Sequence, residues 1–239
     1  DGKVAGVLAT NKDGEEVKIN CKAAVVATGG AGANPEMIKQ ETGFDFGVNM
    51  FNFAIPGIMG DGMKMAWEAG AAKSQVRIEM AASVEGCDSL PQSVPNVFSQ
   101  PNLLVNTHGK RFMNEDHMQN TTYLSNAVSK QKNCVGFSII DSSIVKHYMK
   151  NGVDVISLVR TNPDVSDFKD GIQMAIDNGS TSFFVADTIE ELAEKAGINV
   201  DNLLDTIDEY NDYCDTADEE FYKPRKYMRP ITKAPFYCR

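Results

Sequence analysis

The stretch CKAAVVATGG, residues 21–30, decides the fold that the sequence predicts. Residues 21–27 form an apolar run of strand length, and such a run is typical of a strand buried on both faces of a sheet. Small residues at 27–30 would let the backbone approach a ligand closely at the carboxyl end of that strand, where α/β folds bind nucleotides. A strand followed by an ordinary tight turn explains the same residues equally well, so this stretch alone leaves both interpretations open.

A second Gly-rich element, GDG at residues 60–62, precedes a run with helical periodicity that extends to about Ala69. Asp61 is a favourable N-cap, and Gly70 is favourable just after a helix end. A helix N-terminus offers free backbone N–H groups and favours negative charge, which suits a pyrophosphate. Asp61 could accept a hydrogen bond from a ribose or ribityl hydroxyl, or it could merely cap its helix.

The rest of the chain predicts a β-meander followed by alternating helices and strands. Residues 81–101 are rich in Pro, Ser and Asn and are expected to form a loop. Thr188 and Glu191 form a capping box, and Asp201 is expected to cap the last long helix. Strands are expected at 3–10 and 15–20, joined as a hairpin by residues 11–14, and at 75–80, 103–106, 111–113, 134–140 and 181–186; helices are expected from Pro35 and over 61–69, 117–131, 141–150, 166–178, 188–196 and 201–214.

The composition excludes several classes of protein. Of the 239 residues, 42% are hydrophobic and 23% are charged, as in an ordinary globular protein. The formal net charge of −10 argues against a nucleic-acid groove, which needs a basic face. The sequence holds no apolar run of the roughly 20 residues that a membrane-spanning helix needs. The 5 cysteines are widely spaced without a CxxC motif, so no metal site or disulfide framework is expected.

Four motifs occur together and in a fixed order: ATGGAGANPEM at 27–37, GDGMKMAWEAGA at 60–71, LLVNTHGKRFMNE at 103–115, and IDEYNDYC at 207–214 with DEEFYKP at 218–224. This pattern resembles the FAD-binding family of fumarate reductase and succinate dehydrogenase flavoproteins, which also contains urocanate reductases and ketosteroid dehydrogenases. The resemblance covers nearly the whole chain, and the order of the motifs is far more specific than any one of them.

The resemblance implies an α+β architecture with three parts. Residues 1–80 would be part of the α/β FAD-binding domain, residues 81–225 would be the capping domain that contacts substrate, and residues 226–239 would return toward the FAD-binding domain. Arg111 and Glu115 are expected to hold the 103–113 hairpin to its neighbours rather than to perform chemistry. The implied FAD contacts are Ala27, Thr28, Gly29, Gly30, Gly60 and Asp61.

The family's N-terminal GxGxxG fingerprint has no counterpart in this sequence. The chain begins abruptly at Asp1, inside a strand-like run, and we therefore expect it to be an internal piece of a longer protein. FAD is the cofactor expected of the intact protein, while the chain by itself is expected to bind FAD weakly or not at all. The sequence does not distinguish a cytoplasmic from an exported bacterial protein.

The capping residues depart from those of the fumarate reductases. Gln119 stands where the resemblance places the proton-donating Arg, and an amide cannot donate a proton in that way. Ala81 or Ala82 stands in place of a substrate-binding His, and Val94, Pro95 and Phe98 replace a Thr-Glu pair and an Arg. The other candidates at the catalytic position, besides Gln119, are His117, which a surface role would also explain, and Tyr123, which a core role would also explain.

The resemblance therefore implies hydride transfer between FAD and a carbon–carbon bond of a small organic substrate other than fumarate. An electron-donor protein or domain is a possible partner of such an enzyme, and the chain alone is expected to be inactive. Two alternatives stay open. One is a non-catalytic capping or binding domain, and the other is a ketosteroid-type dehydrogenase, which the apolar Val94, Pro95 and Phe98 slightly favour.

Overall fold

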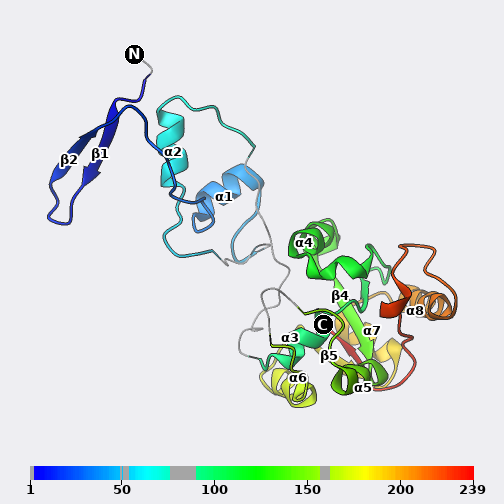
Figure 1. The fold of residues 1–239 in the computed structure, drawn as a ribbon. Helices are drawn as coiled ribbons and strands as arrows, with labels where there is room; N and C mark the ends of the chain where they lie inside the picture. Colours follow the sequence, from blue (N-terminus) through cyan, green and yellow to red (C-terminus); the bar gives the residue numbers. More distant parts are fainter. Residues whose placement is uncertain (1–2, 49, 51–53, 76–89, 157–161) are drawn as a thin grey trace. The chain divides into compact units, whose positions relative to one another are not determined.

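A computed structural model describes residues 3–48, 50, 54–75, 90–156 and 162–239. The chain divides into two compact units, unit 1 over Asp1–Glu79 and unit 2 over Met80–Arg239 (Figure 1). Each unit is described by itself. None of the helices in the described part of the chain combines the length and the apolar composition that a membrane crossing requires.

Unit 1 begins with the expected hairpin of β1 (Gly6–Thr10) and β2 (Glu16–Asn20), in which Val7 lies opposite Ile19. Asn11 orders the turn, because its side-chain oxygen accepts from the backbone N–H groups of Asp13 and Glu15 at 2.9 Å each. The hairpin prediction is confirmed.

Two helices complete unit 1. Helix α1 (Pro35–Thr42) starts at Pro35, as expected, because Asn34 accepts from the N–H of Met37 and proline at the first helical position gives up no hydrogen bond. Helix α2 (Asp61–Glu68) is capped by Gly60 in the left-handed region, with φ 81° and no side-chain cap bond. The prediction that Asp61 is the N-cap was wrong: Asp61 is the first helical residue.

Residues 21–27 do not form the buried strand that their composition predicts. They form no strand, and Val25 and Val26 are 93% and 53% exposed. A strand needs a neighbour to pair its backbone groups, and among the described residues no strand lies beside this segment. The prediction of a strand buried on both faces is therefore wrong for the described residues of unit 1.

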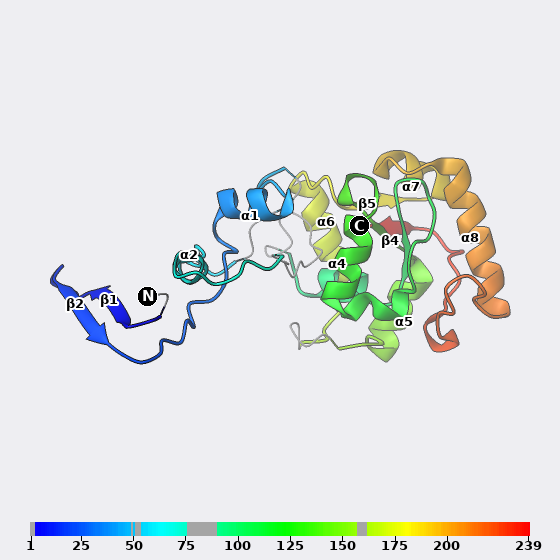
Figure 2. The same cartoon turned by 90° about the horizontal axis from the view of Figure 1, so that it is seen from above.

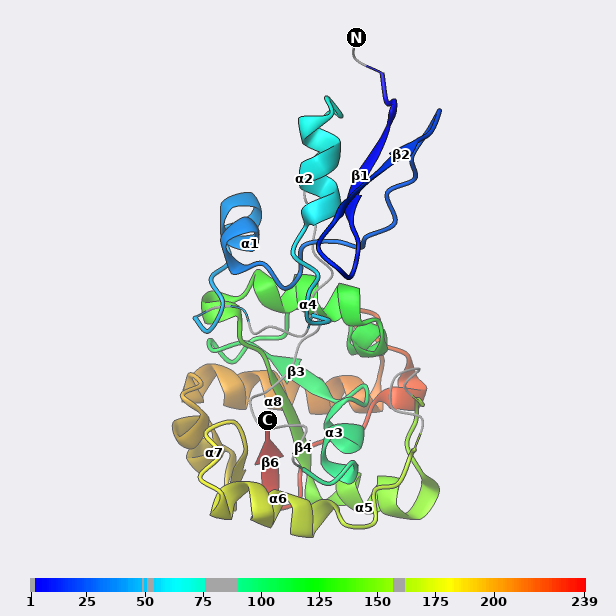
Figure 3. The same cartoon turned by 90° about the vertical axis from the view of Figure 1, so that its left-hand side faces the viewer.

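Unit 2 is built on an antiparallel four-stranded sheet in the order β3-β4-β6-β5. In Figure 2 the strands of this sheet lie between α6 and α8, and in Figure 3 α8 passes behind the strands while α6 lies below them. Large, fully buried side chains from the strands and from both helical layers form the core, among them Phe98, Leu103, Ile139, Tyr148, Phe168, Leu192, Leu203 and Tyr210. The elements are α3 (Ser93–Phe98), β3 (Leu103–Val105), η2 (Glu115–Gln119), α4 (Thr121–Ser129), η3 (Lys132–Cys134), β4 (Phe137–Asp141), α5 (Ser142–Asn151), α6 (Phe168–Asp177), β5 (Phe184–Ala186), α7 (Ile189–Ala196), α8 (Val200–Asp215), η4 (Arg225–Tyr227) and β6 (Phe236–Cys238).

The α+β class is confirmed, and three local predictions were wrong. The stretch 81–101 is not all loop, because the buried helix α3 lies within it. The helix expected over 117–131 is divided into η2 and α4 at Asn120, whose side chain accepts from the N–H of Tyr123 and so starts a new helix. Helix α8 is capped by Asn199 rather than by Asp201, since the Asn199 side chain accepts from the N–H of Asn202 at 2.9 Å.

The predicted cap of α7, two predicted strands and the predicted domain bounds have different outcomes. The capping box at α7 is confirmed in part, with Thr188 accepting from the N–H of Glu191 at 3.1 Å. The expected strand 111–113 is reduced to a single bridge between Val105 and Arg111. The expected strand 75–80 and Ala81 and Ala82 lie largely or wholly outside the described residues. Strand β6 belongs to the sheet of unit 2, while the division into parts at 80 and 225 stays a prediction.

Candidate functional site

The two Gly-rich motifs of unit 1 are joined in space. The N–H of Gly60 donates to the carbonyl of Gly30 at 3.1 Å, and the N–H of Ala33 donates to the carbonyl of Ile58 at 2.9 Å. The Asn34 amide adds a third link by donating to the carbonyl of Met59 at 2.9 Å. These bonds fix the turn after residue 27 against the loop that leads into α2, although the motifs are about 30 residues apart in sequence.

Gly62 is required by the closeness of these two segments. A Cβ on Gly62 would lie 1.9 Å from Oγ1 of Thr28 and 2.6 Å from Cγ1 of Val26. Gly60 is constrained in a second way, because its φ of 81° favours glycine and its Cβ would lie 2.6 Å from the sulfur of Met37. The glycines of GDG therefore let the first turn of α2 rest directly on the segment 26–28.

The resulting surface can receive an anionic or hydroxyl-bearing ligand. The N–H groups in the first turn of α2 have no intrahelical partners, and the helix dipole favours negative charge there. Thr28, Gly29 and Gly30 are exposed beside them, and a Cβ on Gly30 would meet open space. Six sequence-predicted FAD residues are thus brought together in one unit, namely Ala27, Thr28, Gly29, Gly30, Gly60 and Asp61. Their small side chains and free donors fit part of an FAD cradle, and their contact with FAD stays a prediction.

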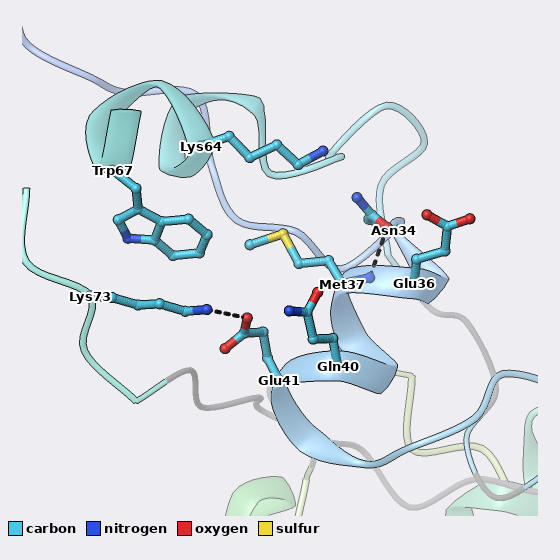
Figure 4. Close-up of a pocket in the computed structure, with 8 residues that line it drawn as sticks. All are labelled: Asn34, Glu36, Met37, Gln40, Glu41, Lys64, Trp67 and Lys73. Carbon is cyan, nitrogen blue, oxygen red and sulfur yellow. Dashed lines mark hydrogen bonds and ion pairs between the residues drawn. The ribbon is translucent and has the colours of Figure 1, made fainter. Parts of the chain in front are cut away.

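A polar groove of about 320 Å³ lies between α1 and α2 (Figure 4). Its wall includes Trp67, the one tryptophan of the sequence, and Met37. Lys73 forms an ion pair with Glu41 and lies 4.8 Å from the centroid of the Trp67 ring. The lining also carries Glu36 and Lys64, so two acids balance two bases and the groove selects neither sign of ligand. None of the predicted FAD residues lines it.

The predicted catalytic residues lie on unit 2. His117 is exposed and Tyr123 is 48% exposed, and their ring centroids are 5.0 Å apart at an interplanar angle of 54°. The structure therefore brings His117 and Tyr123 together across the break at Asn120. The core alternative for Tyr123 is not supported, because its ring lies on the surface.

Gln119 has a different role from the other two. Its Nε2 donates to the carbonyl of Ser99 at 2.6 Å, which ties η2 to the end of α3. An amide group cannot supply a proton, and this one is engaged with the backbone. The apolar substitutions are also explained by packing, since Val94 and Phe98 are 0% and 1% exposed and lie in the core of unit 2. They do not line a substrate surface in unit 2.

The RFMNE and DEEFYKP motifs meet in a buried ionic cluster that the sequence did not fully predict. Arg111 makes paired hydrogen bonds to Glu115 (3.0 and 2.8 Å) and to Asp218 (2.9 and 2.8 Å), and these three side chains are 0–1% exposed. Lys223 is also buried, and its Nζ donates to the hydroxyl of Tyr210 at 2.8 Å. The expectation that Arg111 and Glu115 hold the hairpin to its neighbours is supported.

Burial and pairing oppose each other within this cluster. Burial alone would raise the pKa of Asp218, but the hydrogen bonds and the charge of Arg111 outweigh it and lower that pKa to about 2. Burial lowers the pKa of Lys223 against the attraction of Glu115. The signal that could have revealed the cluster was the pairing of an Arg-containing motif with an acidic motif about 107 residues later.

Comparison with known proteins identifies the class. The chain matches the FAD binding domain family over residues 1–238, and it belongs to that family. FAD is therefore confirmed as the cofactor of the class, and the flavoprotein resemblance is confirmed. The particular relatives are oxidoreductases and are longer than this chain.

A vinyl phenol reductase of Lactiplantibacillus plantarum is 30% identical over 99% of this chain and 50% of its own length. A probable fumarate reductase of Shewanella frigidimarina is 26% identical over the whole of this chain and 36% of its own length. Among solved structures, a 3-ketosteroid delta1-dehydrogenase of Sterolibacterium denitrificans shares the fold with a TM-score of 0.63 at 20% identity, over 99% of this chain and 44% of that one. The chain thus spans half or less of each of these proteins.

Proposed function

We propose that this chain is part of a flavin-dependent oxidoreductase that transfers hydride between FAD and a carbon–carbon bond of a small organic substrate. The observation that carries the proposal is the contact of the Thr28–Gly30 turn with the start of α2 in a member of the FAD binding domain family. When bound, the flavin supplies the hydride chemistry. Residues 27–30 and 60–62 would hold part of it, and unit 2 would contact substrate and supply the proton.

The proposed substrate is a conjugated alkene without the two carboxylates of fumarate. Gln119 supports this, because its amide donates to Ser99 and carries no proton to transfer. The vinyl phenol reductase relative supports an alkene that is conjugated with an aryl ring. The ketosteroid alternative loses its support from Val94 and Phe98, which pack in the core, and the fold likeness that remains does not select a substrate.

His117 is the proposed proton donor, with the Tyr123 ring tilted against it. In the full-length protein, His117→Gln is expected to lower kcat about 100-fold with little change in KM, because loss of a general acid removes stabilisation of the transition state only. His108→Gln is the matched control, since His108 is likewise exposed and lies in the turn of the 103–111 hairpin. Equal rates for wild type and His117→Gln would remove His117 from the mechanism.

The substrate proposal is tested by an anaerobic assay of the full-length protein with reduced viologen as the electron donor. Turnover is expected with 4-vinylphenol and not with fumarate. Comparable turnover of fumarate would overturn the substrate proposal, and a protein that contains FAD but oxidises a 3-ketosteroid instead would favour the alternative. A full-length protein that binds no flavin would favour a non-catalytic binding domain. An electron-donor protein or domain stays a proposed partner.

A further inference from the structure

Arg229, Asp154 and His147 form a cluster in unit 2 that the proposed function does not use. The guanidinium of Arg229 donates two hydrogen bonds of 2.7 Å to the carboxylate of Asp154. The same Nη2 lies 2.9 Å from Nε2 of His147. The three residues come from helix α5, from the segment that follows it, and from the segment after η4, so the cluster fastens three parts of the chain that are up to 82 residues apart.

The geometry fixes the protonation state of His147. A guanidinium has only donors, so Nε2 must accept and the imidazole must be neutral, with its proton on Nδ1. Nδ1 lies 3.1 Å from Nδ2 of Asn151. A half-turn of that amide, which exchanges its nitrogen and oxygen, lets Oδ1 accept from the N–H of Nδ1. A protonated ring would set an N–H against an N–H and place a second positive charge beside Arg229.

The other groups around His147 do not reverse this preference. Asp154 is the one carboxylate in the cluster, and both of its oxygens are engaged by Arg229. Tyr148 presents the edge of its ring at a centroid distance of 5.7 Å, and its hydroxyl lies 2.9 Å from Oδ1 of Asn102 and 3.3 Å from Oδ2 of Asp154. Lys146 and Lys150 on the same helix are exposed. Burial lowers the pKa of His147, and Arg229 lowers it further against the opposing effect of Asp154.

The segment after α5 is held from two sides. On one side, the Gln100 side chain accepts from the N–H of Val155 at 2.9 Å and donates to the carbonyl of Val155 at 3.1 Å. On the other side, Asp154 accepts two hydrogen bonds from Arg229, and Arg229 also contacts Nε2 of His147. The amide contacts of Gln100 do not depend on pH, whereas the contact of Arg229 with His147 does.

We infer that His147, Arg229 and Asp154 form a pH-sensitive latch, in which neutral His147 holds Arg229 on Asp154 and proton uptake by His147 loosens residues 152–156. The folded state disfavours the protonated His147 ring, so the pKa of His147 is lower in the folded than in the unfolded protein. The latch is therefore complete above the pKa of an unfolded His, about 6.5, and it is lost as the pH falls through the pKa of His147 in the folded state. The core of unit 2 stays intact during this change, because the latch lies at its margin.

Amide hydrogen exchange of the full-length protein at about pH 7.5 and about pH 5.5, corrected for intrinsic rates, tests the latch. Protection of residues 152–156 is expected to fall about fivefold at the lower pH, while helix α7 keeps its protection. His147→Gln is expected to abolish this dependence, because its Oε1 can accept from Arg229 and cannot be protonated. His108→Gln is the control and is expected to retain it.

The latch is overturned if protection of 152–156 is independent of pH in the wild type, or if His147→Gln shows the same dependence as the wild type. A second measurement does not depend on how the variant folds. An NMR titration of the His147 imidazole in the wild type is expected to give a pKa below about 6.5. A value at or above that figure would contradict the latch directly.

Discussion

Replacement of Arg111 by Ala is expected to lower the free energy of unfolding of unit 2 by about 3–5 kcal/mol. The guanidinium binds Glu115 and Asp218 through two hydrogen bonds each, and all three side chains are nearly inaccessible. Without Arg111, two carboxylates would remain buried with Lys223 as the nearest cation, 3.7 Å from Glu115. The loss of stability comes mainly from these uncompensated buried charges and not from the net stabilisation that the ion pairs provide.

Urea unfolding followed by circular dichroism would measure the effect. Arg225→Ala is a matched control, because Arg225 is exposed and donates to the carbonyl of Thr216, and it is expected to change stability by less than about 0.5 kcal/mol. Arg111→Lys should be less harmful than Arg111→Ala, because an ammonium keeps a compensating charge, but it should still be destabilising because it cannot form two paired contacts. Equal stability of Arg111→Ala and Arg225→Ala would contradict the role of the cluster.

The pH dependence of the cluster follows from Asp218. Its pKa in the folded state is lowered to about 2 from an ordinary 3.8. A lowered carboxyl pKa gives stability that is fully present above the unfolded value and is lost as the pH falls through the folded value. The contribution of the Arg111–Asp218 pair should therefore persist at pH 5 and decline between about pH 4 and about pH 2.

Substitution of Gly62 by Ala is expected to weaken FAD binding by the full-length protein about 10- to 100-fold. The added Cβ would overlap the side chains of Thr28 and Val26, which are β-branched and have few rotamers to escape into. The start of α2 would have to move away from the turn at 28–30, and its free N–H groups would lose their position. FAD affinity is measured by quenching of flavin fluorescence during titration of the apoprotein.

Two companion variants distinguish this effect from a general loss of stability. Met65→Ala changes an exposed side chain on the same helix and should leave FAD affinity within about twofold. Thr28→Ala combined with Gly62→Ala removes the closest overlapping atom, Oγ1, and should recover part of the affinity. Unchanged FAD affinity in Gly62→Ala would show that FAD binding does not depend on the contact between α2 and the turn at 28–30.

Local signals in the sequence predicted the local structure well. The helix start at Pro35, the cap at Thr188, and the turn at residues 11–14 each depend on hydrogen bonds within a few residues, so the sequence pattern predicted them. The errors at Asp61 and Asp201 have the same origin. In both places a neighbour, Gly60 or Asn199, could also start the helix. Each of these neighbours is held by a distant residue, since Gly60 donates its N–H to Gly30 and Asn199 donates its N–H to Thr107.

Features that depend on contacts between residues far apart in the chain could not be predicted from the sequence pattern. The run at 21–27 was read as a buried strand from its composition, but burial requires a neighbouring strand, and the described residues of unit 1 do not supply one. The motif order placed residues 27–30 and 60–61 in one predicted site, and the structure brings them together in unit 1, while their contact with FAD stays a prediction. The close contact of Gly62 with Thr28 was not predicted, because a sequence pattern shows where a glycine lies but not which distant residue packs against it.

The most direct test of the account is amide hydrogen exchange of the full-length protein with and without saturating FAD. The account predicts that exchange at Gly29, Gly30, Asp61 and Gly62 slows at least about tenfold when FAD binds, because these N–H groups would face the ligand. Helix α7 of unit 2 should show no such change. FAD binding that leaves the 28–30 turn and the start of α2 unprotected would contradict the claim that these two motifs form part of the cofactor site.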